Sequence, residues 1–304
     1  MAVQTDIIGD TVAKGIGAMA VAVSLFAVAD ACAKWLGSAG FHPTQIVFLR
    51  YVFGLVPVTV ALWLARGQGL RTSRPAAHLL RGFLMCMALL QFFWGLKFIP
   101  LAEAIAVAFT APLFITALSV PVLRETVGPH RWAAVAVGFF GMLVILRPGT
   151  AAFQAEAFLI VGSALTFSVA VLYTRILTAT ESNAAMFTYT TIVSLIAMAP
   201  FALTTWQAPG EFDLALFALI GLVGGAAHFL VIVAYRHAPA SVNAPFEYTA
   251  LIWGCLLGWV IWREAPDAPV WIGAAVIIFA GLYITYRETM LGRAPVKVKD
   301  PAPH

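Results

Sequence analysis

Three charged side chains, Asp30, Arg50 and Glu247, lie inside long apolar runs of the sequence. A charge at the centre of a bilayer costs roughly 2.5 kcal/mol or more, so such a group needs a partner, a water-lined cavity or a function. Asp30 and Arg50 each lie about six residues from one end of a predicted span, about 9 Å deep. They can pair across adjacent helices, while Lys34 competes for Asp30 from the next turn of the same helix. A structural ion pair and a role in ligand binding both remain open.

The carboxyl group of Glu247 has the strongest case for a function among the acids. It lies about seven residues into a predicted span, about 10 Å from the end of that span, and Tyr248 follows it directly. A carboxylate at this depth can bind a cationic group, or it can take up a proton in a coupled cycle. We therefore predict that Glu247 acts in substrate binding or in proton coupling.

Four polar and aromatic side chains, Gln91, Trp94, His228 and Tyr248, can supply hydrogen bonds and ring faces from other predicted spans. Packing is the alternative for each of them. A Trp in a helix bundle is usually a packing or interface residue, and a lone His is more often a satisfied core residue than a ligand. If several of the four line one cavity, a flat aromatic or heterocyclic ligand is the natural fit.

No pattern in the sequence is typical of an enzyme, a cofactor site or a metal site. The chain has no Walker A loop, HExxH or GxSxG, and no cluster of acids and histidines at metal-ligand spacing. Cys32, Cys86 and Cys255 lie in separate apolar runs without CxxC spacing. The formal net charge is +4, but the basic residues stand mainly at the ends of apolar runs. We expect no enzyme activity, no cofactor, no metal and no nucleic-acid partner.

Composition indicates the class of protein that positions these residues. Of 304 residues, 62% are hydrophobic and 11% are charged, whereas about a quarter of an ordinary soluble domain is charged. The apolar excess must face lipid, and it falls into ten continuous runs, mostly near the ~20 residues that cross a bilayer as a helix. The runs are Gly15–Leu36, Thr44–Ala65, Ala77–Leu96, Leu101–Leu123, Trp132–Leu146, Ala157–Tyr173, Ala184–Leu203, Leu214–Tyr235, Ala240–Trp262 and Val270–Tyr286. The sequence thus predicts an all-α integral membrane protein with ten transmembrane helices.

Lysine and arginine predict the orientation, because positive charge near span ends is retained in the cytoplasm. With the N-terminus inside, only Lys34, Lys97, Arg147 and Arg263 fall on the opposite side, and Arg50 stays within a span. Both termini are therefore expected in the cytoplasm. The C-terminal segment is rich in Lys and Pro, so we expect residues 288–304 to form a disordered tail.

The chain contains an internal repeat. When the sequence is shifted by 139 residues and compared with itself, Thr110 falls on Thr249. Further matched pairs are Pro100 with Pro239, Ala111 with Ala250, Leu118 with Leu257, Arg124-Glu125 with Arg263-Glu264, Trp132 with Trp271, and Phe140 with Phe279. Matches among apolar residues are common by chance, whereas Arg-Glu and Trp at matched intervals are not.

The repeat defines two units of five spans, at residues 15–148 and 149–287, after an N-terminal segment of residues 1–14. Because five is odd, the second unit must enter the membrane from the opposite side, which predicts an inverted repeat. Two similar halves in opposite orientation can open a central site to either side in turn. The alternative is that duplication only built a stable helix bundle.

The residues of the repeat resemble the EamA family of the drug/metabolite transporter superfamily. The resemblance rests on Pro100-Leu101-Ala102-Glu103-Ala104, Pro112, Arg124-Glu125 and Gly138 to Pro148, and on the segment from Ala238 to Ala250. It extends over Gly15 to Arg287 and implies a bacterial inner-membrane carrier with ten helices, a central cavity and no ATPase. Leu70 to Pro75, with His78 and Arg81, is similar to bacterial carriers for riboflavin or S-adenosylmethionine.

We therefore expect a secondary transporter that moves a small organic metabolite by alternating access, with uptake of riboflavin or S-adenosylmethionine as the leading hypotheses. One alternative is an exporter of amino acids or metabolites with the same fold. An alternative of another class is a non-transporting membrane receptor or a channel. Protons are a candidate coupling ion. The sequence leaves the direction of transport and the oligomeric state open.

Overall fold

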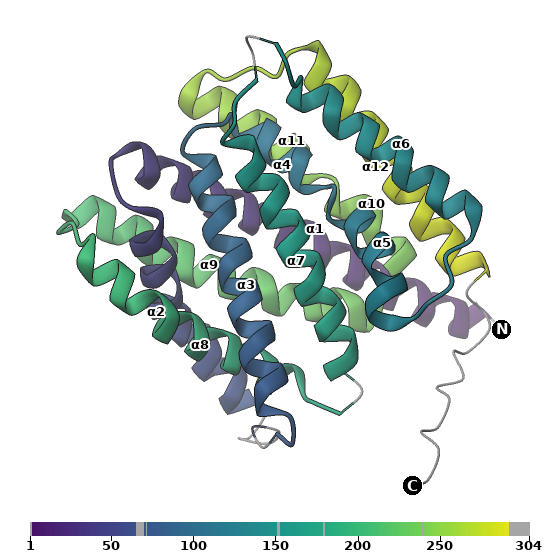
Figure 1. Cartoon of the computed structure of the whole chain (residues 1–304). Coiled ribbons are helices and arrows are strands. Elements are labelled where there is room, and N and C mark those ends of the chain that lie inside the picture. Colours follow the sequence, from purple (N-terminus) through teal and green to yellow (C-terminus); the bar gives the residue numbers. More distant parts are fainter. Residues whose placement is uncertain are drawn as a thin grey trace, which may run out of the picture.

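A computed structural model of the chain describes residues 2–64, 70, 72–150, 153–178, 180–238 and 240–291. Within these residues the regular structure is entirely helical (Figure 1). The helices are α1 (Ala2–Ser38), α2 (Pro43–Leu64), α3 (Pro75–Leu96), α4 (Leu101–Ala108), α5 (Ala111–Leu123), α6 (Pro129–Leu146), α7 (Ala157–Leu177), α8 (Asn183–Thr204), α9 (Glu211–His237), α10 (Ala240–Glu247), α11 (Ala250–Leu257), the π-helical turn η1 (Gly258–Trp262) and α12 (Ala268–Leu291). The all-α fold class predicted from the sequence is confirmed.

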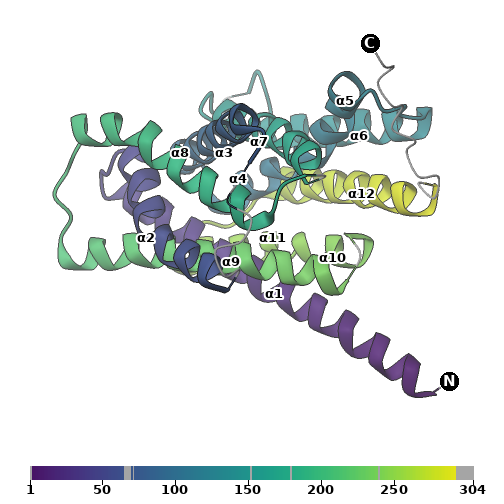
Figure 2. The same cartoon turned by 90° about the horizontal axis from the view of Figure 1, so that it is seen from below.

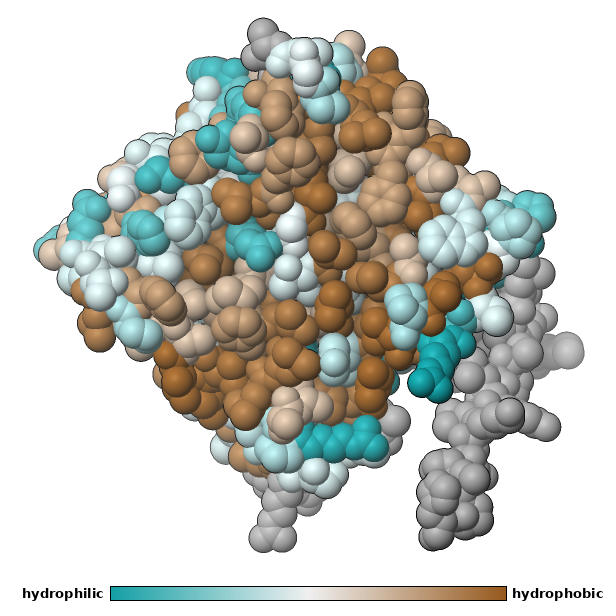
Figure 3. Space-filling model, in the orientation of Figure 1, coloured by the Kyte–Doolittle hydropathy of each residue, from teal (hydrophilic) through white to brown (hydrophobic). Residues whose placement is uncertain are grey.

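Ten stretches of the described helices are long and apolar enough to cross a membrane, as the ten apolar runs predict. The short run at Trp132–Leu146 gains length because α6 begins at Pro129. Proline suits the first turn of a helix, where its missing N–H has no intrahelical partner. Figure 3 shows a broad hydrophobic surface over the middle of the helices, with hydrophilic residues gathered mainly toward their ends. Large apolar side chains such as Phe140, Ile196 and Phe279 are exposed, as expected for residues that face lipid.

Two predicted spans, Leu101–Leu123 and Ala240–Trp262, are broken rather than continuous. α4 gives way to α5 at Phe109 and Thr110, and α10 gives way to α11 at Tyr248 and Thr249. Both breaks stand at the same position of the 139-residue repeat, so the predicted repeat extends to an irregularity of the backbone.

Matched threonines stand at both breaks. The hydroxyl of Thr110 donates to the carbonyl of Val107 at 2.7 Å, and that of Thr249 donates to the carbonyl of Phe246 at 2.6 Å. Such local hydrogen bonds offer the backbone an alternative to the regular helix. In the first break, Pro112 also lacks the N–H that a continuous helix would use.

The packing of the helices follows the repeat as well. α1 packs along α9, and α3 packs along α7, which are equivalent contacts under the 139-residue shift. The equivalent helices α6 and α12 pack against each other and run side by side at one edge of the molecule (Figures 1 and 2). They approach closely at Gly141, where a Cβ would lie 2.9 Å from the carbonyl oxygen of Gly273. Glycine is therefore needed at this crossing.

Residues 292–304 lie outside the described part of the chain, and so does most of the predicted C-terminal tail. The N-terminal segment predicted at residues 1–14 is helical from Ala2 and continues directly into the first span.

Candidate functional site

Five side chains form what we call the central polar cluster: Asp30 on α1, Arg50 and Tyr51 on α2, Arg81 on α3, and His228 on α9. Arg50 lies within electrostatic range of Asp30, and His228 lies within range of both Arg50 and Arg81. Tyr51 lies within range of the same two arginines. The structure thus brings together three of the residues predicted from sequence, Asp30, Arg50 and His228, well inside the helix bundle.

The guanidinium group of Arg50 lies against the backbone of α9. A Cβ built on Gly224 would lie 3.0 Å from Cζ of Arg50, so the absence of a side chain at Gly224 leaves room for the charged group. On another side, Cζ lies 5.7 Å from the centre of the Phe93 ring, a cation–π contact. Arg50 is therefore held between a helix backbone and an aromatic ring, with Asp30 as its nearby acid.

Arg81 is, with Tyr51, one of the two members of the cluster that the sequence analysis did not single out as site residues. It is only 6% exposed, and it donates from Nε to Thr174 Oγ1 at 2.6 Å and from Nη1 to Thr190 Oγ1 at 2.8 Å and to the Met186 carbonyl at 3.1 Å. The sequence analysis names Arg81 in the segment that is similar to bacterial carriers for riboflavin or S-adenosylmethionine, and not among the candidate site residues. Its position four residues inside the apolar run that begins at Ala77 was the signal available.

The imidazole ring of His228 adds an aromatic surface to the cluster. It stacks on Phe187 of α8 with ring centres 5.4 Å apart and planes 9° apart, and Phe26 of α1 meets it edge-on at 6.5 Å. His228 is nevertheless an exposed residue, so the space beside the ring is accessible.

Glu247 forms a second site with a residue that the sequence did not suggest. The hydroxyl of Tyr235 on α9 donates to Oε1 of Glu247. Gly224, His228 and Tyr235 are spaced by four and seven residues, so they lie on one face of α9. The Tyr235–Glu247 pair therefore lies two helical turns, about 10 Å, from His228 along that face, and Glu247 does not join the central polar cluster.

Tyr248 lies where the two helix breaks meet. Its ring packs edge-on against Phe109 with centres 4.9 Å apart, and its hydroxyl occupies the space beside Gly281 of α12. Phe109 and Tyr248 are also partners in the 139-residue repeat. Tyr248 thus contacts its own repeat mate and not the residues around His228.

Lys34 binds Glu264 rather than Asp30. Its Nζ lies 2.5 Å from Glu264 Oε1 and donates to the Ile99 carbonyl at 2.8 Å. The other carboxyl oxygen of Glu264 accepts the backbone N–H of Leu101, at the first turn of α4, at 3.1 Å. Lys34 is 4% exposed, so it does not extend to an interface. The chain brings a carboxylate to Lys34 from the far end of the sequence, which spacing along α1 could not reveal.

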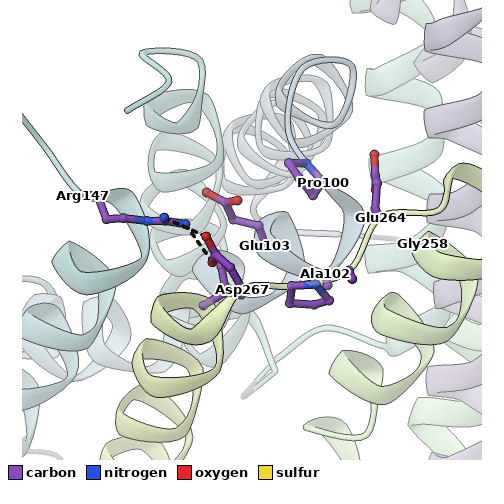
Figure 4. A pocket seen from close by; sticks show the side chains of 10 residues that line it. Pro100, Ala102, Glu103, Arg147, Gly258, Glu264 and Asp267 are labelled. Carbon is purple, nitrogen blue, oxygen red and sulfur yellow. Dashed lines mark hydrogen bonds and ion pairs between the residues drawn. The ribbon is translucent and has the colours of Figure 1, made fainter. Parts of the chain in front are cut away.

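Glu264, the partner of Lys34, lines a cavity of about 130 Å³ at the start of α4 (Figure 4). In Figure 4, Arg147 and Asp267 form a second ion pair at 2.8 Å, and Glu103 lies beside them. We call the side chains of Lys34, Glu103, Arg147, Glu264 and Asp267 the end cluster. It gathers charges from at or near the ends of α1, α4, α6, η1 and α12.

Gln91 and Trp94 do not join the central polar cluster. The side-chain oxygen of Gln91 accepts from Thr166 of α7 at 3.4 Å. Trp94 is 37% exposed and meets His42 edge-on at 5.2 Å, near the end of α3. Their contacts are those of packing residues between neighbouring helices and at a helix end.

A further polar pair joins the first turns of α3, near Arg81, to the connection that follows α7. His78 Nε2 lies 3.2 Å from Oε2 of Glu181, in the connection between α7 and α8. Hydrogen bonding from His78, and further bonds from Thr72 and Ser73, hold the pKa of the Glu181 carboxyl below its usual value. Among the described residues, no group of three or more His, Cys, Asp or Glu is arranged to hold a metal ion.

Comparison with known proteins shows the family of the chain. The chain matches the EamA-like transporter family at residues 13–147 and 154–287. The protein belongs to this family, and it is a transporter that spans the membrane ten times. The family resemblance seen in the sequence is confirmed.

Individual relatives add names and a fold. The chain is 31% identical over 259 residues to the S-adenosylmethionine uptake transporter of Rickettsia prowazekii (strain Madrid E), covering 85% of this chain and 88% of the relative. It is 32% identical over 276 residues to the riboflavin transporter of Vibrio cholerae serotype O1, covering 88% and 91%. A solved crystal structure matches 92% of this chain and 99% of its own with a TM-score of 0.63 and 20% identity, which shows the shared fold.

Proposed function

We propose that the protein is a secondary carrier for S-adenosylmethionine in the bacterial inner membrane and that the central polar cluster is its binding site. The observation that carries the proposal is the cluster itself: one acid, two arginines and a stacked imidazole lie inside a bundle whose lipid-facing surface is apolar. Charges in such a place are expected to bind substrate or ions. The exposed ring of His228 leaves one side of the cluster open for a ligand.

Alternating access is supported by the two halves. Five spans in each half imply opposite orientations, and the matched helix breaks and the Phe109–Tyr248 contact are what a two-fold axis through the middle of the molecule would produce. Interrupted helices near such an axis are a common feature of transporter sites. In this proposal the halves rock about the broken helices and expose the central polar cluster to each side in turn.

Orientation follows from the basic residues. With both termini in the cytoplasm, His228 and the Tyr235–Glu247 pair line the cytoplasmic half of α9, and the end cluster closes the opposite side. In this proposal the Lys34–Glu264 pair blocks the external route when it is formed.

The chemistry of the cluster favours S-adenosylmethionine over riboflavin. S-adenosylmethionine carries a carboxylate, an ammonium group, a sulfonium group and an adenine ring, and these match arginine, Asp30 and the His228–Phe187 stack. Riboflavin has a flat ring but no charged group, so it would leave the arginines and Asp30 without a complement. It is the second candidate, because riboflavin transporters are relatives at similar identity and a flat ring can stack at His228.

Counterflow in liposomes tests the proposal. Purified protein is reconstituted in liposomes loaded with unlabelled S-adenosylmethionine, and labelled S-adenosylmethionine is added outside. A carrier accumulates the label transiently above its equilibrium level, whereas a channel only equilibrates it and a receptor moves none. We expect accumulation with S-adenosylmethionine and none in protein-free liposomes. Accumulation with riboflavin alone would transfer the assignment to riboflavin, and accumulation with neither would refute the proposed substrate.

A further inference from the structure

Arg81 is held by uncharged partners only. Its Nε and Nη1 donate to two threonine hydroxyls and one carbonyl, on α7 and α8. Among the residues that the structure describes, no carboxylate pairs with it, whereas Arg50 has Asp30 within range. A buried guanidinium without an anion is unfavourable, because its lost hydration is not repaid by an opposite charge. An anionic group from outside the chain is the natural complement.

The surroundings of Arg81 fix its guanidinium in place. The hydroxyl of Thr174 donates to the Ala170 carbonyl and that of Thr190 donates to the Met186 carbonyl, both at 2.8 Å. Each hydroxyl proton is thus committed to the backbone, which leaves the oxygen lone pairs to accept from Arg81. The remaining nitrogen, Nη2, has no hydrogen-bond partner in the described part of the chain. A fixed guanidinium with a spare donor suits a carboxylate.

The aromatic stack stands next to this donor. Phe187, which stacks on His228, lies one turn of α8 before Thr190, and it directly follows Met186. The charge of Arg81 also reaches His228. One ligand can therefore place a carboxylate at Arg81 and a flat ring at His228.

We propose that Arg81 binds the carboxylate of the transported substrate and so selects substrates that carry one, an inference that rests on the proposed function. A purely structural arginine that ties α3 to α7 and α8 would affect every substrate alike. The two roles therefore differ in selectivity, and a pair of ligands that differ only in the carboxylate separates them.

The test measures inhibition of labelled S-adenosylmethionine binding by unlabelled S-adenosylmethionine and by its decarboxylated form, which keeps the amine, sulfonium and adenine. Wild-type protein is expected to prefer the carboxylate form about 10- to 100-fold, as for a hydrogen bond to a charged group. Arg81→Gln is expected to lose most of that preference, while affinity for the decarboxylated form changes less than about threefold.

Two further variants make the result decisive. Arg81→Lys keeps the charge but not the planar donor array, so we expect part of the preference for the carboxylate form to remain. If Arg81→Gln does not fold, the same preference is measured in Arg81→Lys. Arg175→Gln removes an exposed charge one residue after Thr174 and is expected to behave as wild type. Equal weakening of both ligands in the Arg81 variants, or an unchanged preference, would overturn the inference while leaving the proposed function intact. Wild-type protein that binds neither compound would overturn both.

Discussion

The Lys34–Glu264 ion pair provides a sharp prediction about conformation. Replacing Glu264 with Gln keeps the shape of the side chain but leaves Lys34, with 5% of its side chain exposed, without its counter-ion. Breaking a buried pair on one side costs roughly 3–5 kcal/mol. Since 25% of the Glu264 side chain is exposed, we take a smaller value of about 2 kcal/mol. In the state that is open to the outside, water hydrates Lys34 and this cost disappears. The ratio of the externally closed state to the open state therefore falls about 30-fold.

Accessibility of the cavity in Figure 4 reports the shift. Ala102 lines that cavity and is 4% exposed. In a background without Cys32, Cys86 and Cys255, Ala102→Cys is labelled with a membrane-impermeant maleimide. We expect labelling about 30-fold faster when Glu264→Gln is added, provided that opening limits the rate.

Asp267→Asn is the matched control for this experiment. It breaks the Arg147–Asp267 pair of the same cluster, whose side chains are 25% and 52% exposed, and exposed pairs contribute only about 0–1 kcal/mol. Labelling should therefore rise by less than about fivefold. The reasoning is wrong if Glu264→Gln accelerates labelling no more than Asp267→Asn does.

Three further predictions concern Arg50, Glu247 and Glu181. Gly224→Val should displace the Arg50 guanidinium, which lies 3.0 Å from the position of the new Cβ, and lower substrate affinity. The control Gly17→Val, where a Cβ meets nothing within 4 Å, should leave affinity unchanged. Equal affinities in the two variants would contradict a role of Arg50 in binding. Glu247→Gln should abolish the stimulation of uptake by an imposed proton gradient in liposomes, and Tyr235→Phe should weaken it; transport by Glu247→Gln that is normal at every pH would exclude a coupling role. Glu181→Gln should lower the thermal unfolding temperature at neutral pH. Because the folded pKa of Glu181 is lowered, its stabilisation is present above the unfolded value of about 4.3 and is lost as pH falls through the folded value. The difference from wild type should therefore vanish in acid, and a difference that persists there would refute the assignment.

The sequence predicted the spans well because lipid imposes a simple rule on it. Every backbone polar group in the hydrocarbon must be satisfied internally, so a long apolar run becomes a helix. The same rule says little about where a helix breaks. Thr110 and Thr249 were visible as a matched pair, but their hydroxyl bonds to Val107 and Phe246 became apparent only in the folded chain.

The site was predicted in part, for a different physical reason. Asp30, Arg50 and His228 could be identified because polar side chains inside apolar runs are costly. Lys34 was identified by the same criterion but pairs with Glu264, 230 residues away in the sequence, and spacing along one helix cannot reveal such a partner. Arg81 lies close to the end of its predicted span, where a basic residue is common, and only the folded chain shows that Thr174 and Thr190 hold it inside.

Equilibrium binding of labelled S-adenosylmethionine to purified Asp30→Asn protein tests most directly whether the central polar cluster binds substrate. The asparagine keeps the size of the side chain and removes the charge that complements the ammonium or sulfonium group, so affinity should fall about 10-fold or more. Glu211→Gln, at the exposed start of α9, should bind like wild type. Wild-type affinity in Asp30→Asn would contradict the account.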